Sequence, residues 1–166
     1  MRILGIDPGS ARIGYGLIEC TPEGNEPRAL RWGTLEISPQ DASGRMREVG
    51  ERIAALLREC APDHAGIEKL FFARNKKTAL AVAEARGVIL FALGKAGVPC
   101  FELGPADIKI AVTNYGLADK RTVAAMVGKI LRLREAVGYD DASDALAAAL
   151  AAINRLRDPS RRAAMR

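Results

Sequence analysis

The first third of the chain contains three short apolar runs separated by turn-forming residues, a pattern typical of β-strands. The runs occupy residues 2–7, 12–20 and 28–37. Residues 21–27 contain two prolines, a glycine and an asparagine, which predicts a hairpin between the second and third strands. The first run ends on Asp7, and the Pro-Gly pair that follows it forces a turn.

The rest of the chain alternates helical and strand patterns. Apolar residues recur at helical spacing from Ser43 until Pro62 ends the helix. The inward positions of this helix are Met46, Val49, Ile53, Leu56, Leu57 and Cys60. Strands are expected at 64–68 and 98–103, and helices at 78–95, 105–112, 119–132 and 142–157. This order predicts an α/β fold with a five-stranded mixed sheet, in which an antiparallel hairpin edge lies beside parallel strands and helices flank the sheet.

Length and composition are those of an ordinary globular protein. Of the 166 residues, 49% are hydrophobic and 27% are charged, which suits one domain with a real core. We expect this domain over residues 1–157 and a basic, flexible tail over residues 158–166, solvated or in weak contact with phosphate. No apolar run has the length of a membrane span and the N-terminus lacks a signal-peptide pattern, so we expect a cytoplasmic protein.

Charge and the scarcity of certain residues narrow the chemistry. The net charge of +5 favours a polyanionic partner. The three cysteines stand far apart with no CxxC pair, and His64 is the only histidine, which argues against a zinc site. Any bound metal must therefore be held by oxygen ligands.

Four carboxylates occupy positions where the predicted fold would bring them together. Asp7 and Glu68 each end a buried strand, and the C-terminal ends of parallel strands meet at one sheet edge, where open α/β sheets bind ligands. Asp141 and Asp144 are three residues apart, so they share one face of the last helix. Ala145, Ala148 and Ala152 extend that face, and Leu146, Leu150 and Ile153 lie toward the other side. Such an alanine stripe lets the helix press against the sheet and carry its acids to the edge.

Four carboxylates in one place repel one another unless cations balance them. Oxygen ligands without histidine or cysteine suit Mg²⁺ or Mn²⁺, and a pair of such ions supports phosphoryl displacement. Each acid also has a plainer interpretation: a turn residue for Asp7, a surface residue for Glu68, an N-cap for Asp141 and a helix-dipole contact for Asp144. Sequence alone leaves these alternatives open.

Three segments together resemble the RuvC-type Holliday junction resolvases: GIDPGSARIGYGLI, IEKLFFARN and DASDALAAAL. The resemblance extends over nearly the whole chain. It implies a ribonuclease H-like fold, a homodimer, and cutting of four-way DNA junctions with Mg²⁺ or Mn²⁺, two ions per active site when substrate is bound. It also implies 5′-phosphate and 3′-hydroxyl ends and a branch-migration helicase complex as partner.

The resemblance assigns the family's four catalytic and metal-binding acids to Asp7, Glu68, Asp141 and Asp144. The third of these is histidine in some members of the family. Here it is Asp141, preceded by another acid, Asp140, which could compete as a ligand but breaks the three-residue step.

The resemblance also implies DNA contacts. Phe71 matches the family's aromatic that stacks on an unpaired base, with Phe72 beside it. Two consecutive residues of a polar loop do not easily both fill the core, so we expect one ring inward and one exposed. Lys109, which we expect to be catalytic, and Lys120, which we expect to bind DNA, match basic residues used near the cut site or on phosphate. Both could instead be solvated helix lysines. A basic loop expected to contact backbone phosphates comprises Arg74, Asn75, Lys76 and Lys77.

The helix at residues 78–95 carries Ala79, Ala83 and Gly87 at four-residue steps, and we expect the homodimer to form through it. Three other functions remain to be weighed against the junction endonuclease. They are a related ribonuclease H-like nuclease acting on RNA, a phosphate-binding ATPase of the actin and sugar-kinase class, and a junction-binding protein without activity. The ATPase class needs two such domains, for which 166 residues are too few.

Overall fold

The structure is a computed structural model that describes residues 1–23, 25–38, 41–70, 76–133 and 140–157, with residues 76–78 placed only as part of a helix. The strands are β1 (Arg2–Asp7), β2 (Arg12–Glu19), β3 (Arg28–Glu36), β4 (His64–Glu68) and β5 (Cys100–Leu103). The helices are α1 (Ala42–Cys60), α2 (Lys76–Lys95), α3 (Pro105–Thr113), α4 (Lys120–Ile130) and α5 (Asp141–Arg157). Within the described chain, no helix is long and apolar enough to cross a membrane.

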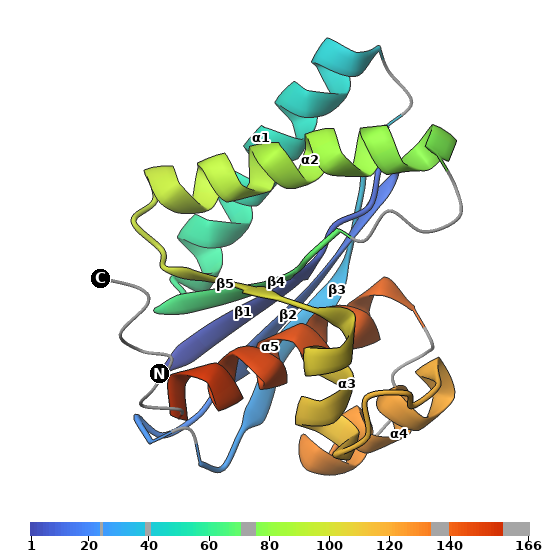
Figure 1. Cartoon of the computed structure of the whole chain (residues 1–166). Helices are drawn as coiled ribbons and strands as arrows, with labels where there is room; N and C mark the ends of the chain where they lie inside the picture. Colours follow the sequence, from blue (N-terminus) through green and yellow to red (C-terminus); the bar gives the residue numbers. More distant parts are fainter. Residues whose placement is uncertain (24, 39–40, 71–75, 134–139, 158–166) are drawn as a thin grey trace.

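The strands form one mixed sheet in the order β3-β2-β1-β4-β5 (Figure 1). β1 pairs with β2, and β2 with β3, in antiparallel fashion. β1 pairs with β4, and β4 with β5, in parallel fashion. The predicted α/β fold, with an antiparallel edge beside parallel strands, is therefore confirmed.

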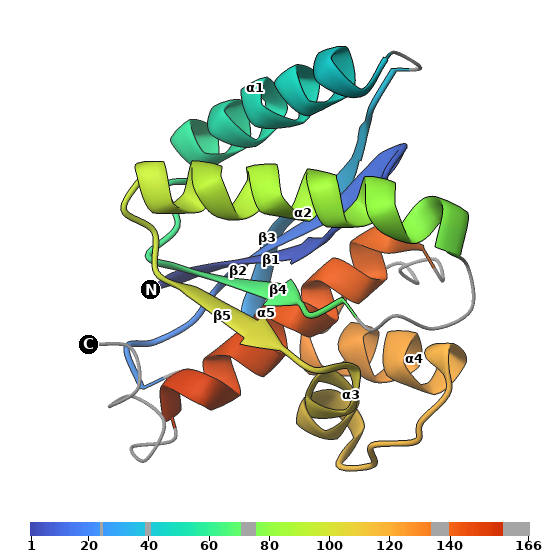
Figure 2. The ribbon, with the colours of Figure 1, turned by 45° about the horizontal axis from the view of Figure 1, so that its top comes forward.

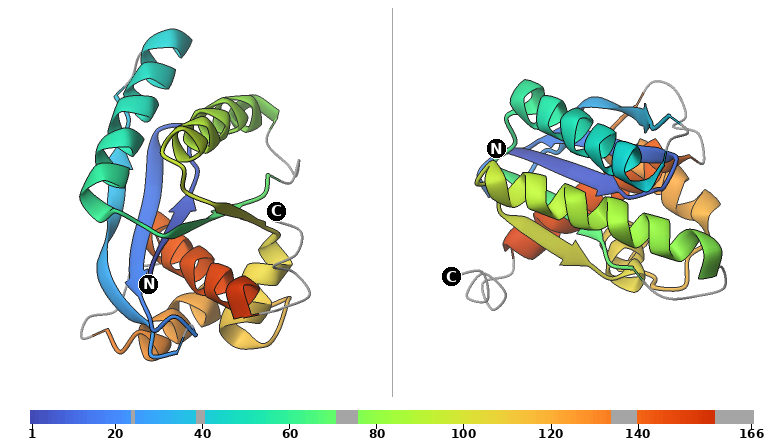
Figure 3. Two further views of the ribbon diagram at one scale, coloured as in Figure 1. Left: turned by 90° about the vertical axis from the view of Figure 1, so that its left-hand side faces the viewer. Right: turned by 90° about the horizontal axis from the view of Figure 1, so that it is seen from above.

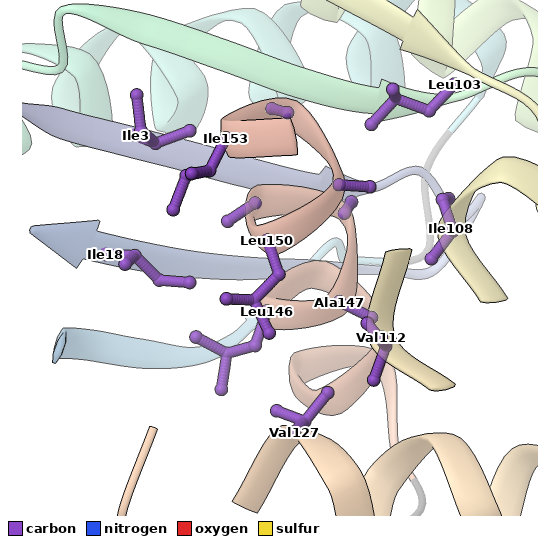
Figure 4. Close-up of a cluster of buried hydrophobic side chains, with 14 of the residues drawn as sticks. Ile3, Ile18, Leu103, Ile108, Val112, Val127, Leu146, Ala147, Leu150 and Ile153 are labelled. Carbon is purple, nitrogen blue, oxygen red and sulfur yellow. The ribbon is translucent and has the colours of Figure 1, made fainter. Parts of the chain in front are cut away.

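Helices cover both faces of this sheet. α1 and α2 lie on one face, while α5 crosses the other with α3 and α4 beside it (Figures 2 and 3). On the first face Val49, Ile53, Leu56 and Leu57 of α1 are buried, as their helical spacing predicts. On the second face the core gathers around α5, whose Leu146, Leu150 and Ile153 lie among side chains of β1, β2, α3 and α4 (Figure 4).

α5 lies very close to the sheet because small residues face one another across the contact. A Cβ built on Gly5 of β1 would stand 1.8 Å from the carbonyl oxygen of Ala145, and one on Gly66 of β4 would stand 2.9 Å from the Cβ of Ala152. The predicted alanine stripe is confirmed as the contact face. Leu146, Leu150 and Ile153 are buried too, but not all on a side away from the sheet: Leu146 lies against Gly16 of β2, and all three belong to the core that residues of β1, β2, α3 and α4 complete.

Most predicted boundaries hold within two residues, and the differences have local causes. The strand expected at 98–103 begins at Cys100, because the turn after α2 passes through Gly97, whose φ of 68° is left-handed. The helix expected at 119–132 ends at Ile130, and Arg132 beyond it has a left-handed φ of 52°. At its start, Asp119 accepts a hydrogen bond from the backbone N–H of Thr122, which makes it the N-cap.

Candidate active site

A cavity of about 210 Å³ lies where the ends of β1 and β4 meet the first turns of α3, α4 and α5. Its polar lining consists of Asp7, Glu68, Lys109, Lys120 and Asp144. Its apolar lining consists of Pro105, Ile108, Val123 and Ala147. Five elements distant in sequence therefore direct acids and lysines to one point at the C-terminal edge of the parallel strands.

The sheet brings the first two acids together. Ile6 pairs with Ile67 in the parallel β1–β4 ladder, so Asp7 and Glu68 are the next residues on neighbouring strands and leave the sheet at the same edge. The apolar residues before them, Ile6 and Ile67, are fully buried and fix both strands in the core. Asp7 is thus neither a simple turn residue nor a solvated one, and Glu68 lines the cavity as well.

The start of α5 supplies the other two acids. Asp140 accepts a hydrogen bond from the backbone N–H of Ser143 at 3.2 Å and so occupies the N-cap position. The plainer interpretation of Asp141 as the N-cap is therefore wrong, and Asp140 is engaged as a cap. Asp144 lines the cavity, whereas Asp141 lies at its margin and contributes to the electrostatic environment of Asp7.

Burial and mutual repulsion disfavour the charged forms of the sheet acids. Burial, followed by the negative charges of Asp144, Glu68 and Asp141, raises the pKa of Asp7 from 3.8 to about 7. Burial and Asp144 also raise the pKa of Glu68, while Lys120 and Lys109 act in the opposite direction. The site therefore holds more negative charge than its own cations balance.

Two basic side chains form ion pairs with the acids of α5. The Lys120 ammonium lies 2.7 Å from Oδ2 of Asp144, and this hydrogen bond raises the pKa of the lysine. Nε of Arg12, the first residue of β2, lies 3.1 Å from Oδ2 of Asp141. Lys120 is thus placed inside the acid cluster. Sequence reasoning missed Arg12, since only the register of β2 against β1 and the closeness of α5 bring it to this point.

The carboxylate oxygens of the site are the ligand type that a hard divalent cation prefers, but the acids do not lie close enough together to share one as they stand. The acids offer oxygen ligands alone, and the pKa of Asp7 is raised first by burial and then by the negative charges of its neighbours, which such an ion would balance. Within the described part of the chain, no three Asp, Glu, His or Cys side chains lie close enough together to hold an ion as they stand. Because Lys120 and Arg12 hold Asp144 and Asp141, the carboxylates must shift before they can share a cation.

Several predicted DNA-contact residues lie outside the described residues, namely Phe71, Phe72, Arg74 and Asn75. Lys76 and Lys77 form the beginning of α2, and their side chains are also outside the description. Along the chain this segment falls between β4, which ends at Glu68, and α2, which begins at Lys76. The predicted DNA contacts of these residues remain predictions.

The family profile described as Crossover junction endodeoxyribonuclease RuvC matches residues 3–152. A protein of that name from Syntrophomonas wolfei is 42% identical over 158 residues, which cover 95% of this chain and 91% of the relative. The Thermus thermophilus RuvC structure superposes with a TM-score of 0.83 at 35% identity, covering 92% of this chain and 94% of that one. The T. thermophilus RuvC in complex with a Holliday junction substrate gives a TM-score of 0.86 at 34% identity, covering 95% of each chain.

Proposed function

The chain belongs to the RuvC family of crossover junction endodeoxyribonucleases, and we propose that the cavity at the β1–β4 edge is the site with which it cuts its substrate. Its function is accordingly the resolution of Holliday junctions, a phosphodiester hydrolysis of recombination and DNA repair. The ribonuclease H-like fold accords with the T. thermophilus structures. The alternative of a nuclease acting on RNA is not favoured, since a relative at 34% identity was solved with a junction substrate.

The observation that carries the assignment of the site is the convergence of acids from β1, β4 and α5 on one cavity. We assign Asp7, Glu68, Asp141 and Asp144 as the ligands of two Mg²⁺ or Mn²⁺ ions. Ions held by these residues would supply an activated water and positive charge at the attacked phosphate and the leaving oxygen. The protein contributes ligands fixed on rigid elements, because Asp7 ends a buried strand and Asp144 stands on a helix pressed against the sheet.

Lys109 is proposed to act directly on the reacting phosphate. It lines the cavity from α3, opposite the end of β4, and it lowers the pKa of Glu68 through its charge. A fixed ammonium at this place stabilises the negative charge that grows on the phosphate oxygens in the transition state. Lys120 is proposed to contact DNA phosphate after it leaves Asp144.

The DNA-contact loop is proposed to comprise Phe71, Phe72, Arg74, Asn75, Lys76 and Lys77. It connects β4, which ends at Glu68, to α2, so a base stacked on a phenylalanine would lie close to the proposed cut site. The basic side chains behind the rings would hold the phosphodiester backbone. Residues 158–166 are proposed as a basic tail outside the domain of residues 1–157.

A homodimer through α2 is proposed as the active assembly. Leu80 and Phe91 of this helix are 67% and 72% exposed, and Gly87 between them has open space around it. The three residues share one helical face with Glu84, which is paired with Arg45, and their exposed apolar surface is available for close approach of a second copy. A two-fold dimer would present two sites to a junction with two opposed strands to cut, and a branch-migration helicase complex would act with it.

Incubation of the protein with an end-labelled four-way junction and with Mg²⁺ or Mn²⁺ tests the proposed function. We expect paired nicks in opposed strands, with 5′-phosphate and 3′-hydroxyl ends, and no nicks in EDTA. Asp7→Asn is expected to abolish cleavage while junction binding persists. Cleavage by this variant at the wild-type rate would rule out the site, and cleavage of structured RNA in preference to the junction would favour the RNA nuclease.

A further inference from the structure

Arg12 and Asp141 form an ion pair at the margin of the proposed active site, with 3.1 Å between Nε and Oδ2. We propose that Arg12 is a positioning residue that holds Asp141 in the free protein and transfers to a phosphate of the junction, leaving Asp141 to bind the divalent cation. Arg12 thereby couples loading of the metal to binding of DNA. This inference rests on the proposed function of the site.

The two partners differ in how firmly they are held. Asp141 is fixed by its backbone, since a Cβ on Gly14 of β2 would stand 1.9 Å from the Asp141 carbonyl oxygen, and its side chain is only 27% exposed. The Arg12 side chain is 61% exposed and reaches the acid through its Nε. The backbone of the acid is therefore fixed and only its carboxylate can turn, whereas the exposed guanidinium is the partner that can leave.

The start of α5 does not need Arg12 to hold it in place. Asp140 caps the helix through the Ser143 amide, and the backbone of Asp141 lies directly on Gly14. Ala142 and Ser143, the next two residues, are buried. An ion pair this exposed adds little to the free energy of folding. Its main effect is to offset the negative charge of Asp141.

An arriving phosphate offers Arg12 a better partner than the carboxylate. Phosphate oxygens accept paired hydrogen bonds from a guanidinium as a carboxylate does, and the contact with DNA gains in addition from the release of counterions. Once Arg12 has moved, Asp141 joins Asp7 and Glu68, which have no ion pair with a basic side chain within the described chain. The negative charge then exposed at the edge attracts the cation at the time when substrate is present.

The test compares Arg12→Gln with two controls. Arg28→Gln removes an arginine of similar exposure that pairs with Glu19 at 2.8 Å, at the opposite end of β2 from Arg12. Arg12→Lys keeps the positive charge. Free Mn²⁺ is measured by electron paramagnetic resonance in titrations of the DNA-free protein, and junction binding is measured at several salt concentrations in EDTA.

Arg12→Gln is expected to raise the Mn²⁺ affinity about two- to fivefold, because an exposed competing ion pair is removed. It should also lower the slope of log affinity for the junction against log salt by about one. Arg28→Gln should behave as the wild type, and Arg12→Lys should keep the wild-type salt slope because it keeps the positive charge. If Arg12 had a purely structural role, Arg12→Gln would lower the Mn²⁺ affinity. The proposal is overturned by a lowered or unchanged Mn²⁺ affinity, and equally by an unchanged salt slope. Failure of the wild type itself to cut the junction would count against the function of the site and not against Arg12 alone.

Discussion

Gly5 of β1 and Ala145 of α5 touch backbone to backbone, with the position of a Gly5 Cβ only 1.8 Å from the Ala145 carbonyl oxygen. No side chain fits between them. The contact sets the distance of α5 from the sheet and so determines whether Asp144 reaches the cavity that Asp7 and Glu68 line. The geometry of the site is thus a consequence of core packing.

The first prediction concerns this contact. Gly5→Ala is expected to force α5 away from β1, to destabilise the protein by about 1–3 kcal/mol or more, and to lose most of the cleavage activity. Gly128→Ala is the matched control, because Gly128 lies in α4 with open space around it and gains helix propensity from a methyl group. Denaturant unfolding and junction cleavage are the measurements. A Gly5→Ala protein as stable and active as the wild type would show that the helix can shift without consequence.

The elements of this fold could largely be predicted from sequence, because each carries its own periodic pattern. The helical spacing of Val49, Ile53 and Leu56 and the alternation of short apolar strands are local signals. The shared sheet edge of Asp7 and Glu68 also followed from strand order. These are properties of segments that fold by short-range rules and pack by simple topology.

The ion pairs of the site could not be predicted in the same way. Arg12 reaches Asp141 only because β2 returns antiparallel to β1 and because Gly14 lets α5 approach. Lys120 had no pattern to separate it from a solvated helix lysine, yet it lies against Asp144. Exact registers and side-chain partners across distant elements depend on the whole packed structure, which local spacing does not record.

The second prediction concerns the pH dependence of stability without metal. The folded pKa of Asp7, about 7, lies above its ordinary value of 3.8, so ionisation of this group opposes folding as pH rises from about 4 through 7. Asp7→Asn is therefore expected to be more stable than the wild type in EDTA at pH 8, by roughly 2–4 kcal/mol, and to lose this advantage toward pH 4. Thermal unfolding across that pH range measures the difference.

Added Mg²⁺ or Mn²⁺ provides the control for the same variant. The cation should stabilise the wild type at pH 8 and leave Asp7→Asn nearly unchanged, because the variant lacks a proposed ligand. Equal stabilisation of both proteins by metal would contradict the assignment of Asp7. A wild type that is more stable than the variant in EDTA at pH 8 would contradict the raised pKa.

The third prediction concerns the lysine of α3. Lys109→Ala is expected to lower the single-turnover cleavage rate about 10²- to 10³-fold at saturating metal, since it removes a positive charge from the lining of the proposed active site. Junction affinity should change much less, because one of many phosphate contacts is lost. Lys129→Ala, at the exposed end of α4, is the control and should cut at the wild-type rate. A loss confined to binding would place Lys109 among the DNA contacts.

The fourth prediction concerns the apolar face of α2. Phe91 is 72% exposed and Gly87, one turn earlier, has open space around it, so a charged group at position 91 would enter the proposed dimer contact. Phe91→Asp is expected to convert the protein from dimer to monomer with little loss of thermal stability, because the ring is mostly exposed in one protomer. Light scattering coupled to size-exclusion chromatography measures the mass. The control Leu117→Asp, which changes an exposed leucine between α3 and α4, should leave the dimer intact.

On a junction the monomer should make single nicks in place of paired ones, since no second site is held across the crossover. A wild-type protein of monomeric mass that still makes paired nicks would rule out α2 as the dimer interface.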